Sequence, residues 1–589
     1  MRRQLEIEAS GLAGNLDKVW PDVRDSAWIG GNCEGWERVP YWLDGFIPLA
    51  YLLESEDMIE RAKKYVDAIV KNQKPSGWIC PCEEDKIESY DPWAVILITK
   101  VLTVYYDCSR DARIPDVIYK TLKNYYELLK SGKAKLFQWG KCRWFEAFIA
   151  INFIYGRFKE EWLIDLAAIL CEQGADYASV KDEWIRPLNV WQYNTHIVNI
   201  AMMLKTEAVT ADLLGDKYKG SAEKLRSFLD KYNGTVTGIF TGDECLSGIS
   251  PIQGTELCAV VEQMYSYELL FAATNEDRWA QRLEKIAFNA LPATFTDDMW
   301  AHQYVQQANQ IACERFRGKS VFRTNGYDSS VFGLEPEYGC CTANQVQGWP
   351  KFALSSFMKR DNEIISAVPI PSKLDCEDAK IELVTDYPFK NEFVYKIKAK
   401  KNIKFTVRIP SFAKEYKANG KDPDSKSRVS FEIKEGEEKE IKVSFKTEPR
   451  LIARPNKMKS VVCGSLVFSL PIVYEKRMHE YERKGVVRKF PYCDYEYLPK
   501  SDWNYGFTSD KFVIKQHKVD DIPFSSEHPA VTLRTKCAKI DWGYEDGYDN
   551  VCAKIPNSAK AIDKEEEITL YPYGCAKLRM TEMPLVKGK

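Results

Sequence analysis

The sequence predicts a multidomain α + β protein, in which an N-terminal (α/α)6 barrel precedes C-terminal β-sandwich domains. The chain has 589 residues, which is too long for one compact core. Of its 16 tryptophans, 14 lie before residue 350. Apolar residues recur at helical spacing before about residue 360 and alternate after it. We expect the barrel over 1–358, a β-sandwich over 359–475 and a second β-rich domain over 476–589.

The helical pattern begins near the N-terminus. Leu43, Ile47 and Ala50 lie on one face, and Ser55 interrupts the pattern with a polar break. A second stripe contains Ala62, Tyr65, Val66, Ile69 and Val70. Similar runs cover about 91–107, 113–130, 144–156, 160–173, 194–206, 218–232, 256–273 and 278–291.

A faint repeat indicates that these helices pair. Segment 71–78 ends a helical run with Gly77 and Trp78, and segment 231–240 does much the same with Gly238 and Phe240. Helical hairpins stacked in a ring bury one face of each helix against the next. An (α/α)6 barrel fits this pattern, and a non-repeating helical domain remains the alternative.

Strands are predicted wherever apolar and polar residues alternate. The period of two is clear at 393–400, 405–409, 429–433 and 441–445. Further strands are expected at 461–470, 512–514, 530–533 and 568–571. Because these segments contain few tryptophans, we expect them to support the main site rather than form it.

Composition and charge exclude several classes of function. Lys and Arg total 83 and Asp and Glu total 85, so the net charge of −2 does not favour nucleic acid or an anionic membrane. The first residues are charged and lack an apolar core, so no signal peptide is expected. No window approaches the roughly 18 apolar residues of a membrane span. We expect a cytoplasmic protein without a membrane partner, and a homodimer stays open.

The cysteines form the most informative motifs. An odd total of 17 in a chain of this length is typical of a reducing compartment, where thiols stay free for chemistry or metal binding. Cys340 and Cys341 are adjacent, and Gly339 permits the tight turn that would let both hold one metal ion. Glu256 and Cys258 fall in the first turn of a predicted helix, where the positive dipole end favours carboxylate and thiolate.

Three sulfurs and one carboxylate would form a four-coordinate zinc site. The alternative is that these cysteines are small core residues, as most free cysteines are. Cys80 and Cys82 form a competing Cys-x-Cys pair with no second half.

The chain resembles the β-L-arabinofuranosidase family of glycoside hydrolases (family 127). The segments 254–258, 283–289 and 339–344 match that family in order and rough spacing, and 570–581 is similar to its C-terminal strand. The resemblance spans nearly the whole chain. It implies an (α/α)6 barrel followed by β-sandwich domains.

The resemblance also implies roles for particular residues. Glu256, Cys258, Cys340 and Cys341 would bind Zn²⁺, and Cys340 would attack the anomeric carbon. Glu244 would be the acid/base residue, since the family has a glutamate shortly before its Glu-x-Cys motif. The gap to Glu256 is shorter than usual, so Asp243 is a rival, and both acids could instead cap a turn.

Further residues are expected to contact the sugar. By resemblance these are His196, Glu284 and Tyr304, together with Arg143, which stands where many members carry histidine. An arginine there suits a carboxylate or a more polar neighbour. A stacking rim or, alternatively, a set of core aromatics is expected from Trp28, Trp36, Tyr41, Trp42 and Trp78.

These inferences predict a retaining glycoside hydrolase with a zinc-bound cysteine nucleophile. Its substrate would be a small plant-derived oligosaccharide carrying β-linked L-arabinofuranose or a related pentose. One alternative is a glycosidase of the same scaffold that acts on an acidic or branched sugar. Another is a carbohydrate-binding protein with a structural zinc, which would need neither Cys340 nor Glu244.

Overall fold

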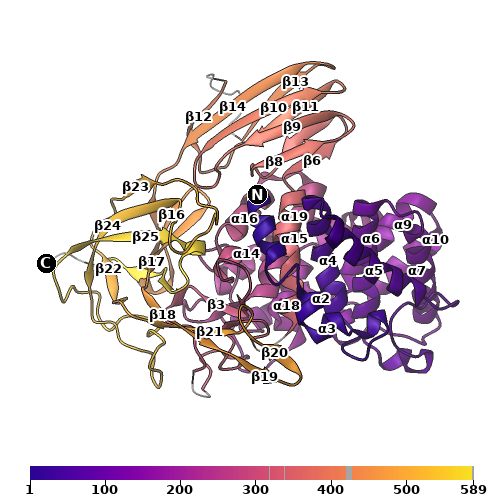
Figure 1. Cartoon of the computed structure of the whole chain (residues 1–589), viewed down its shortest axis with the longest axis horizontal. Helices are drawn as coiled ribbons and strands as arrows, with labels where there is room; N and C mark the ends of the chain where they lie inside the picture. The colour runs from indigo at the N-terminus through magenta and orange to yellow at the C-terminus, as the bar shows by residue number, and fades with distance from the viewer. Residues whose placement is uncertain (317–318, 337–338, 420–426, 587–589) are drawn as a thin grey trace.

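The computed structural model describes residues 1–316, 319–336, 339–419 and 427–586. Helices occupy the N-terminal part and many-stranded sheets the C-terminal part, so the fold class predicted from the sequence is confirmed. In Figure 1 the helices fill the right side, a β-sandwich lies at the top and further strands lie at the left. Within the described residues, no helix is long and apolar enough to cross a membrane.

The inner ring of the barrel has six layers, four of them single helices and two of them pairs of consecutive helices. Each packs on the next around the ring, and the last returns to the first. The inner helices are α4 (Arg38–Leu53), α6 (Trp93–Ser109), α9 (Ala147–Phe158), α12 (Ile197–Met203) with α13 (Thr206–Leu214), α15 (Leu257–Thr274), and α18 (Gly339–Asn344) with α19 (Gly348–Leu354). The outer helices are α1 (Arg2–Ser10), α5 (Glu56–Lys71), α7 (Ile114–Lys130), α10 (Glu161–Gln173), α14 (Ser221–Asn233) and α16 (Asp277–Ala287).

Local sequence explains where several helices begin and what they bury. The Ser55 hydroxyl accepts a hydrogen bond from the Met58 amide and caps α5, whose predicted stripe is buried apart from Val70. The segment 194–206, predicted as one helix, is divided instead. Helix α12 ends at Met203, and α13 starts at Thr206 and continues beyond the predicted end. Short helices are α2 (Leu16–Val19), α3 (Pro21–Arg24), α8 (Gln138–Cys142), α11 (Tyr177–Val180) and α17 (Ala290–Ala293).

A closed ring of alternating charges crosses the barrel interior. Lys100 lies 3.1 Å from Asp44 and 3.2 Å from Glu146, and Lys205 joins Glu146 to Glu262. The Gln347 amide donates to Glu262, and Lys351 closes the ring by donating to Gln347 and to Asp44. Four of the six charges lie within inner helices, whereas Glu146 directly precedes α9 and Lys205 lies between α12 and α13. All six side chains are almost completely buried. The ring therefore ties all six layers together.

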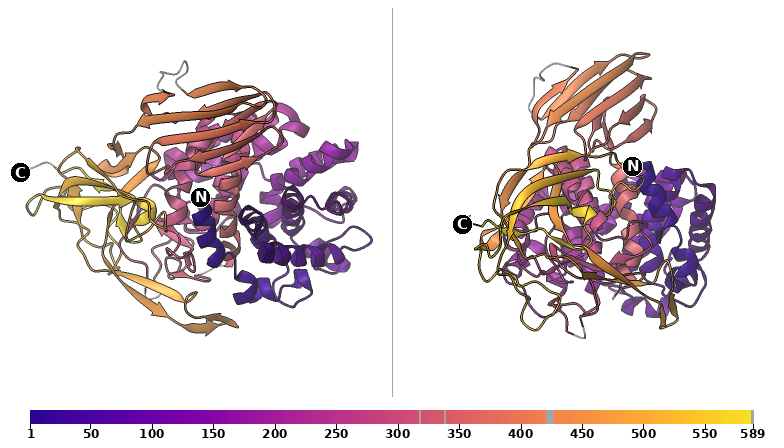
Figure 2. Two further views of the ribbon diagram at one scale, coloured as in Figure 1. Left: turned by 45° about the horizontal axis from the view of Figure 1, so that its top comes forward. Right: turned by 60° about the vertical axis from the view of Figure 1, so that its left-hand side comes forward.

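The first sheet pair follows the barrel directly. One sheet has the order β12 (Lys414–Ala418), β14 (Glu438–Lys446), β10 (Glu392–Ala399), β9 (Ala379–Val384) and β8 (Ser372–Asp375). The other has the order β13 (Arg428–Ile433), β11 (Ile403–Arg408), β7 (Glu363–Ser366) and β6 (Phe357–Arg360). Alternate residues such as Phe393, Tyr395 and Phe405 are buried between them, as the period of two predicts. Figure 2 shows this sandwich from two further sides.

The remaining described strands form one large sheet and three smaller ones. The large sheet contains β15 (Arg450–Ala453), β16 (Met458–Cys463), β17 (Leu466–Pro471), β25 (Glu566–Pro572), β24 (Val531–Lys539) and β22 (Tyr505–Phe507), joined by β23 (Val513–Gln516), β26 (Arg579–Met580), β27 (Met583–Pro584) and β4 (Asn309–Gln310). A four-stranded sheet contains β18 (Tyr474–His479), β21 (Asp494–Pro499), β5 (Phe332–Gly333) and β2 (His302–Gln303). Two two-stranded sheets complete the set: the hairpin of β19 (Tyr481–Arg483) with β20 (Val486–Arg488), and the antiparallel pair of β1 (Gly254–Glu256) with β3 (Val305–Gln307), which are distant in sequence.

Strand pairing bears on where the domains divide. Strands β15–β17 precede residue 475 but pair with strands of the C-terminal large sheet, not with the sandwich. We therefore propose a division after β14 in place of the expected limit at 475. Strands β4 and β5, which lie before residue 358, also pair with C-terminal strands. The barrel and the C-terminal sheets thus share backbone hydrogen bonds.

Candidate active site

One cavity of about 400 Å³ lies among the loops and helix starts at one end of the barrel. This volume falls within the usual range for small-molecule sites. Its lining comes from segments far apart in the sequence: Trp36, Glu37, Arg38, Tyr41, Trp139, Arg143, Trp191, His196, Val198, Glu244, Glu256, Cys258, Tyr304 and Cys340.

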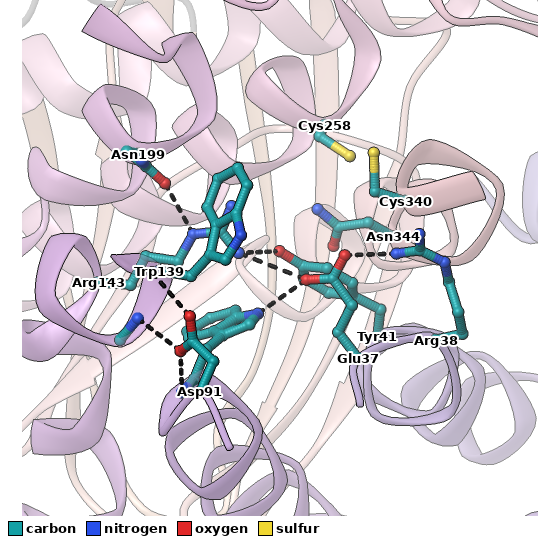
Figure 3. A network of polar contacts seen from close by, with 12 residues as sticks. Glu37, Arg38, Tyr41, Asp91, Trp139, Arg143, Asn199, Cys258, Cys340 and Asn344 are labelled. Atoms are coloured by element: carbon teal, nitrogen blue, oxygen red, sulfur yellow. Dashed lines mark hydrogen bonds and ion pairs between the residues drawn. The ribbon is translucent and has the colours of Figure 1, made fainter. Parts of the chain in front are cut away.

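Four predicted metal ligands lie together beside this cavity, and Glu256, Cys258 and Cys340 line it. One ligand atom from each of Glu256, Cys258, Cys340 and Cys341 lies within 4.8 Å of the others. The sulfurs of Cys258 and Cys341 are 3.2 Å apart, and the Glu256 Oε1 atom is 4.0 Å from the Cys340 sulfur. Figure 3 shows the Cys258 and Cys340 sulfurs facing each other. This cluster can hold a metal ion.

Secondary structure brings these ligands together. Glu256 ends β1 and is the N-cap of α15, so Cys258 lies in the first turn of that helix, as predicted. Cys340 and Cys341 do not sit in the expected tight turn, because they begin helix α18. Gly339 is needed there for packing: a Cβ atom at this position would lie 2.7 Å from the Trp20 ring.

The thiols differ in their electrostatic surroundings. Hydrogen bonds from Cys258 and Cys341, aided by the Arg38 guanidinium, hold the pKa of Cys340 well below its usual range despite burial. Burial raises the pKa of Cys258 and Cys341. Burial and the neighbouring Glu244 raise the pKa of Glu256. Of the three sulfurs, Cys340 is therefore the one that most readily exists as thiolate.

Glu244 lies beside this cluster and is held by three donors. The Trp191 indole and the His196 ring each bind Oε2 at 3.0 Å, and the Tyr304 hydroxyl donates to Oε1. The His196 Nδ1 atom accepts the Asn199 amide, so its Nε2 carries the proton donated to Glu244. The Tyr304 oxygen is also 3.7 Å from the Cys340 sulfur. Tyr304 thus contacts both predicted catalytic groups.

The backbone of Glu244 is strained, whereas its rival Asp243 has a structural role. Glu244 has a φ of 116°, a conformation that non-glycine residues adopt mainly where the surroundings enforce it. The Asp243 carboxylate accepts backbone amides from Gly254 and Arg323 and does not line the cavity. Burial raises the pKa of Asp243 to about 6. Asp243 therefore fixes the loop that presents Glu244.

Arg143 lines the cavity but is already well bonded. Its Nε donates to Asn199 at 2.8 Å, and one Nη donates to the Tyr41 hydroxyl at 3.1 Å (Figure 3). The Glu37 carboxylate lies 3.5 Å away and also pairs with Arg38. Two guanidinium groups thus share one carboxylate on this wall.

Glu284 is not at the site, so its expected contact with the sugar is wrong. Its buried carboxylate pairs with Arg408 of β11 and accepts hydrogen bonds from Tyr387 and Ser465. These partners belong to the sandwich and to the region around β17. A buried carboxylate needs such partners, and here they join α16 to the strands.

The prediction of an aromatic rim is correct only for two of its five residues. Trp36 and Tyr41 line the cavity, but Trp28, Trp42 and Trp78 are core residues. Trp139 and Trp191, which were not predicted, also line the cavity and precede Arg143 and His196 by four and five residues. Glu37 and Arg38, likewise not predicted, form a charged pair directly before the apolar part of α4. Their nearness in sequence to predicted site residues was the available clue.

Asn344, the last residue of the motif that begins with Gly339, Cys340 and Cys341, has a structural role. Its amide donates to Glu262 at 3.2 Å, one turn beyond Cys258 on α15. Helices α15 and α18 therefore meet at two levels, through Cys258 with Cys341 and through Glu262 with Asn344. Asn344 connects the thiol cluster to the charged ring below it.

Comparisons with known proteins agree with this architecture. Residues 21–354 match the model of the β-L-arabinofuranosidase GH127 catalytic domain. A GH127 β-L-arabinofuranosidase from Geobacillus stearothermophilus T6 is similar in structure, with a TM-score of 0.71, 14% identity, and coverage of 100% of this chain and 98% of that one. A GH127 β-arabinofuranosidase gives a TM-score of 0.64 at 13% identity, covering 99% and 95%. The comparison with curated proteins gives no match.

Proposed function

Because this chain belongs to glycoside hydrolase family 127, we propose that it is a retaining hydrolase that releases β-linked L-arabinofuranose, or a related pentose, from plant-derived oligosaccharides. One observation carries the proposal: Cys340 and Glu244 line the same cavity and both contact the Tyr304 hydroxyl. A nucleophile and an acid/base residue on opposite sides of one bound sugar are what a retaining mechanism needs.

We propose that the metal is zinc, held by Glu256, Cys258, Cys340 and Cys341. Zn–S bonds of about 2.3 Å in a tetrahedron place two sulfurs roughly 3.8 Å apart, close to the spacing of this cluster. The Glu256 Oε2 atom is buried without a hydrogen-bond partner among the described residues, as suits a ligand atom. Bound zinc would keep the thiols as thiolates at neutral pH.

The residues of the cavity can carry out two displacements. In the first, the Cys340 sulfur attacks the anomeric carbon while the bond to the leaving oxygen breaks, and Glu244 gives that oxygen its proton. In the second, Glu244 takes a proton from water, and the water oxygen displaces the sulfur. Cys340 returns to thiolate and Glu244 regains its proton. Tyr304 and His196 keep Glu244 in place during both steps.

A reducing compartment suits this site. The proposed nucleophile and two of its neighbours are free thiols, which oxidation would inactivate. We therefore propose the cytoplasm as the place of action, with small glycosides as the binding partners.

The stereochemistry of the product is the test of the proposed function. We expect the released pentose to keep the anomeric configuration of the substrate, because two inversions give net retention. Proton NMR of the first sugar released from a β-L-arabinofuranoside, recorded before mutarotation, measures this. An inverted product would contradict Cys340 as nucleophile, because direct attack by water inverts the centre.

Replacing Glu244 by glutamine is expected to slow hydrolysis of a disaccharide by about 10²- to 10⁴-fold. The effect on a p-nitrophenyl glycoside should be much smaller, because that leaving group needs little protonation. Steady-state rates on both substrates provide the comparison. Asp243→Asn is the matched control, and it should lower thermal stability without this dependence on the leaving group. Equal losses on both substrates for Glu244→Gln would refute the acid/base role.

A second candidate is a glycosidase of the same scaffold that takes an acidic or branched sugar. The observation in its favour is that two guanidinium groups, Arg38 and Arg143, line the cavity and pair with the same Glu37 carboxylate, and an arginine can bind a carboxylate of the substrate. A panel of neutral and carboxylated pentosides distinguishes the two candidates by their relative kcat/KM values.

A further inference from the structure

Three tryptophans form one wall of the cavity, and the two displacement steps of the proposed mechanism give them no role. The Trp139 ring is 6.4 Å from Trp36 and 5.5 Å from Trp191, measured between ring centroids. All three line the cavity together with Cys340 and Glu244. Trp191 is 37% exposed, although it is a large aromatic residue, and we define these three residues as the tryptophan wall.

Neighbouring side chains hold the rings of Trp139 and Trp191 in fixed orientations. Trp139 stacks against the Arg143 guanidinium at 4.4 Å and meets His196 edge-on at 5.0 Å. Trp191 meets Tyr193 edge-on at 4.6 Å. Rigid aromatic faces bind a ligand at a low cost in side-chain entropy.

The hydrogen bond from Trp191 to Glu244 places the wall relative to the reaction. A general acid lies within hydrogen-bond distance of the oxygen that it protonates. The Trp191 indole donates to Glu244 Oε2, while Tyr304 binds the other carboxylate oxygen and contacts Cys340. Oε1 therefore faces the nucleophile, and Oε2 faces the wall. A leaving oxygen protonated by Oε2 would therefore bring its attached group against Trp191.

The chemistry of the wall indicates the kind of group that it takes. Aromatic faces offer apolar area that suits the C–H faces of a sugar ring, and indole N–H groups suit its hydroxyls. The Trp36 Nε1 atom is buried and has no hydrogen-bond partner among the described residues, so it is a donor that a sugar hydroxyl could satisfy.

We propose that Trp36, Trp139 and Trp191 form a leaving-group subsite that binds a second sugar ring, so that the substrate is a disaccharide or longer. This inference rests on the proposed function. It makes Trp191 a specificity-determining residue that contacts the leaving group and also positions Glu244.

The test compares two substrates, an arabinofuranosyl disaccharide and the methyl arabinofuranoside. Trp191→Leu should lower kcat/KM for the disaccharide about 10- to 100-fold more than for the methyl glycoside. Trp191→Phe loses the bond to Glu244 but keeps a ring, so it should slow both substrates and preserve most of their ratio. Phe158→Leu, at an exposed aromatic residue on α9, should change neither rate.

The ratio separates the subsite from a mere positioning role. If Trp191→Leu slows both substrates by the same factor, Trp191 only positions Glu244 and the subsite is refuted. If the wild-type protein cleaves neither substrate, the proposed function fails. Calorimetric binding to the Glu244→Gln protein then decides the subsite separately: tighter binding of the disaccharide supports it, and equal binding refutes it.

Discussion

Replacing Cys340 by serine is expected to reduce turnover of arabinofuranosides by about 10⁴-fold or more. A serine hydroxyl is not ionised at neutral pH, and Glu244 is needed in its protonated form at the first step. The structure surrounds Cys340 with Cys258, Cys341 and Arg38, all of which favour the thiolate. The measurement is kcat on a p-nitrophenyl arabinofuranoside, with metal content and circular dichroism recorded for the same preparations.

Three companion variants separate chemistry from metal binding. Cys258→Ser and Cys341→Ser should lose metal and thermal stability first, because these sulfurs join α15 to α18. Cys376→Ser, at a half-buried thiol of the sandwich, should change neither property. A Cys340→Ser protein with a substantial share of the wild-type rate would show that another group attacks the sugar. Full activity in metal-free wild-type protein would remove the zinc proposal.

Breaking the charged ring is expected to have the largest effect on stability. Lys205→Met removes the cation that lies between Glu146 and Glu262, both completely buried. An uncompensated buried charge costs about 3–5 kcal/mol of unfolding free energy. Burial raises the pKa of Glu262, but Lys100, Lys205 and Lys351 outweigh it and hold that pKa at about 2. Lys205→Met removes one of the three cations that hold this pKa down.

Urea unfolding followed by tryptophan fluorescence measures this loss, since most tryptophans lie in the barrel. The matched control is Lys63→Met, which breaks an exposed pair with Asp67 and should change stability by less than about 0.5 kcal/mol. Equal, small losses in both variants would show that the ring does not stabilise the barrel. Asn344 links the ring to α18, so Lys205→Met should also lower metal affinity.

Much of the architecture was predictable because it depends on local periodicity. The stripe of α5 and the alternation along β10 appear in the sequence as they appear in the structure. Where a segment is buried on every side, periodicity fails. The break between α12 and α13 was missed for this reason, and so was α18, in which two cysteines replace an amphipathic pattern.

Some site residues were predicted well and others were not. Residues whose side-chain chemistry is distinctive were found, whereas residues whose role depends on their position in the fold were not. Thiolate and carboxylate are metal ligands by their chemistry, so Glu256, Cys258, Cys340 and Cys341 could be proposed as one set, and they lie together. Glu284 shows the opposite case. A glutamate in a matching motif looks the same whether it meets a sugar or an arginine, and here it pairs with Arg408.

The sequence by itself determined the fold class and singled out the thiol and carboxylate set, because residue type and spacing limit which chemistry is available, while the family resemblance favoured Glu244 over Asp243 as the acid. Only the tertiary structure decided that Asp243 binds backbone amides, that Trp139 and Trp191 line the cavity, and that six charges close a ring. It also showed that C-terminal residues hold the segment beside Tyr304, since Arg579 donates to the Gln307 carbonyl and β26 pairs with β4. These features join residues up to several hundred positions apart, and such contacts leave no periodic trace in the chain.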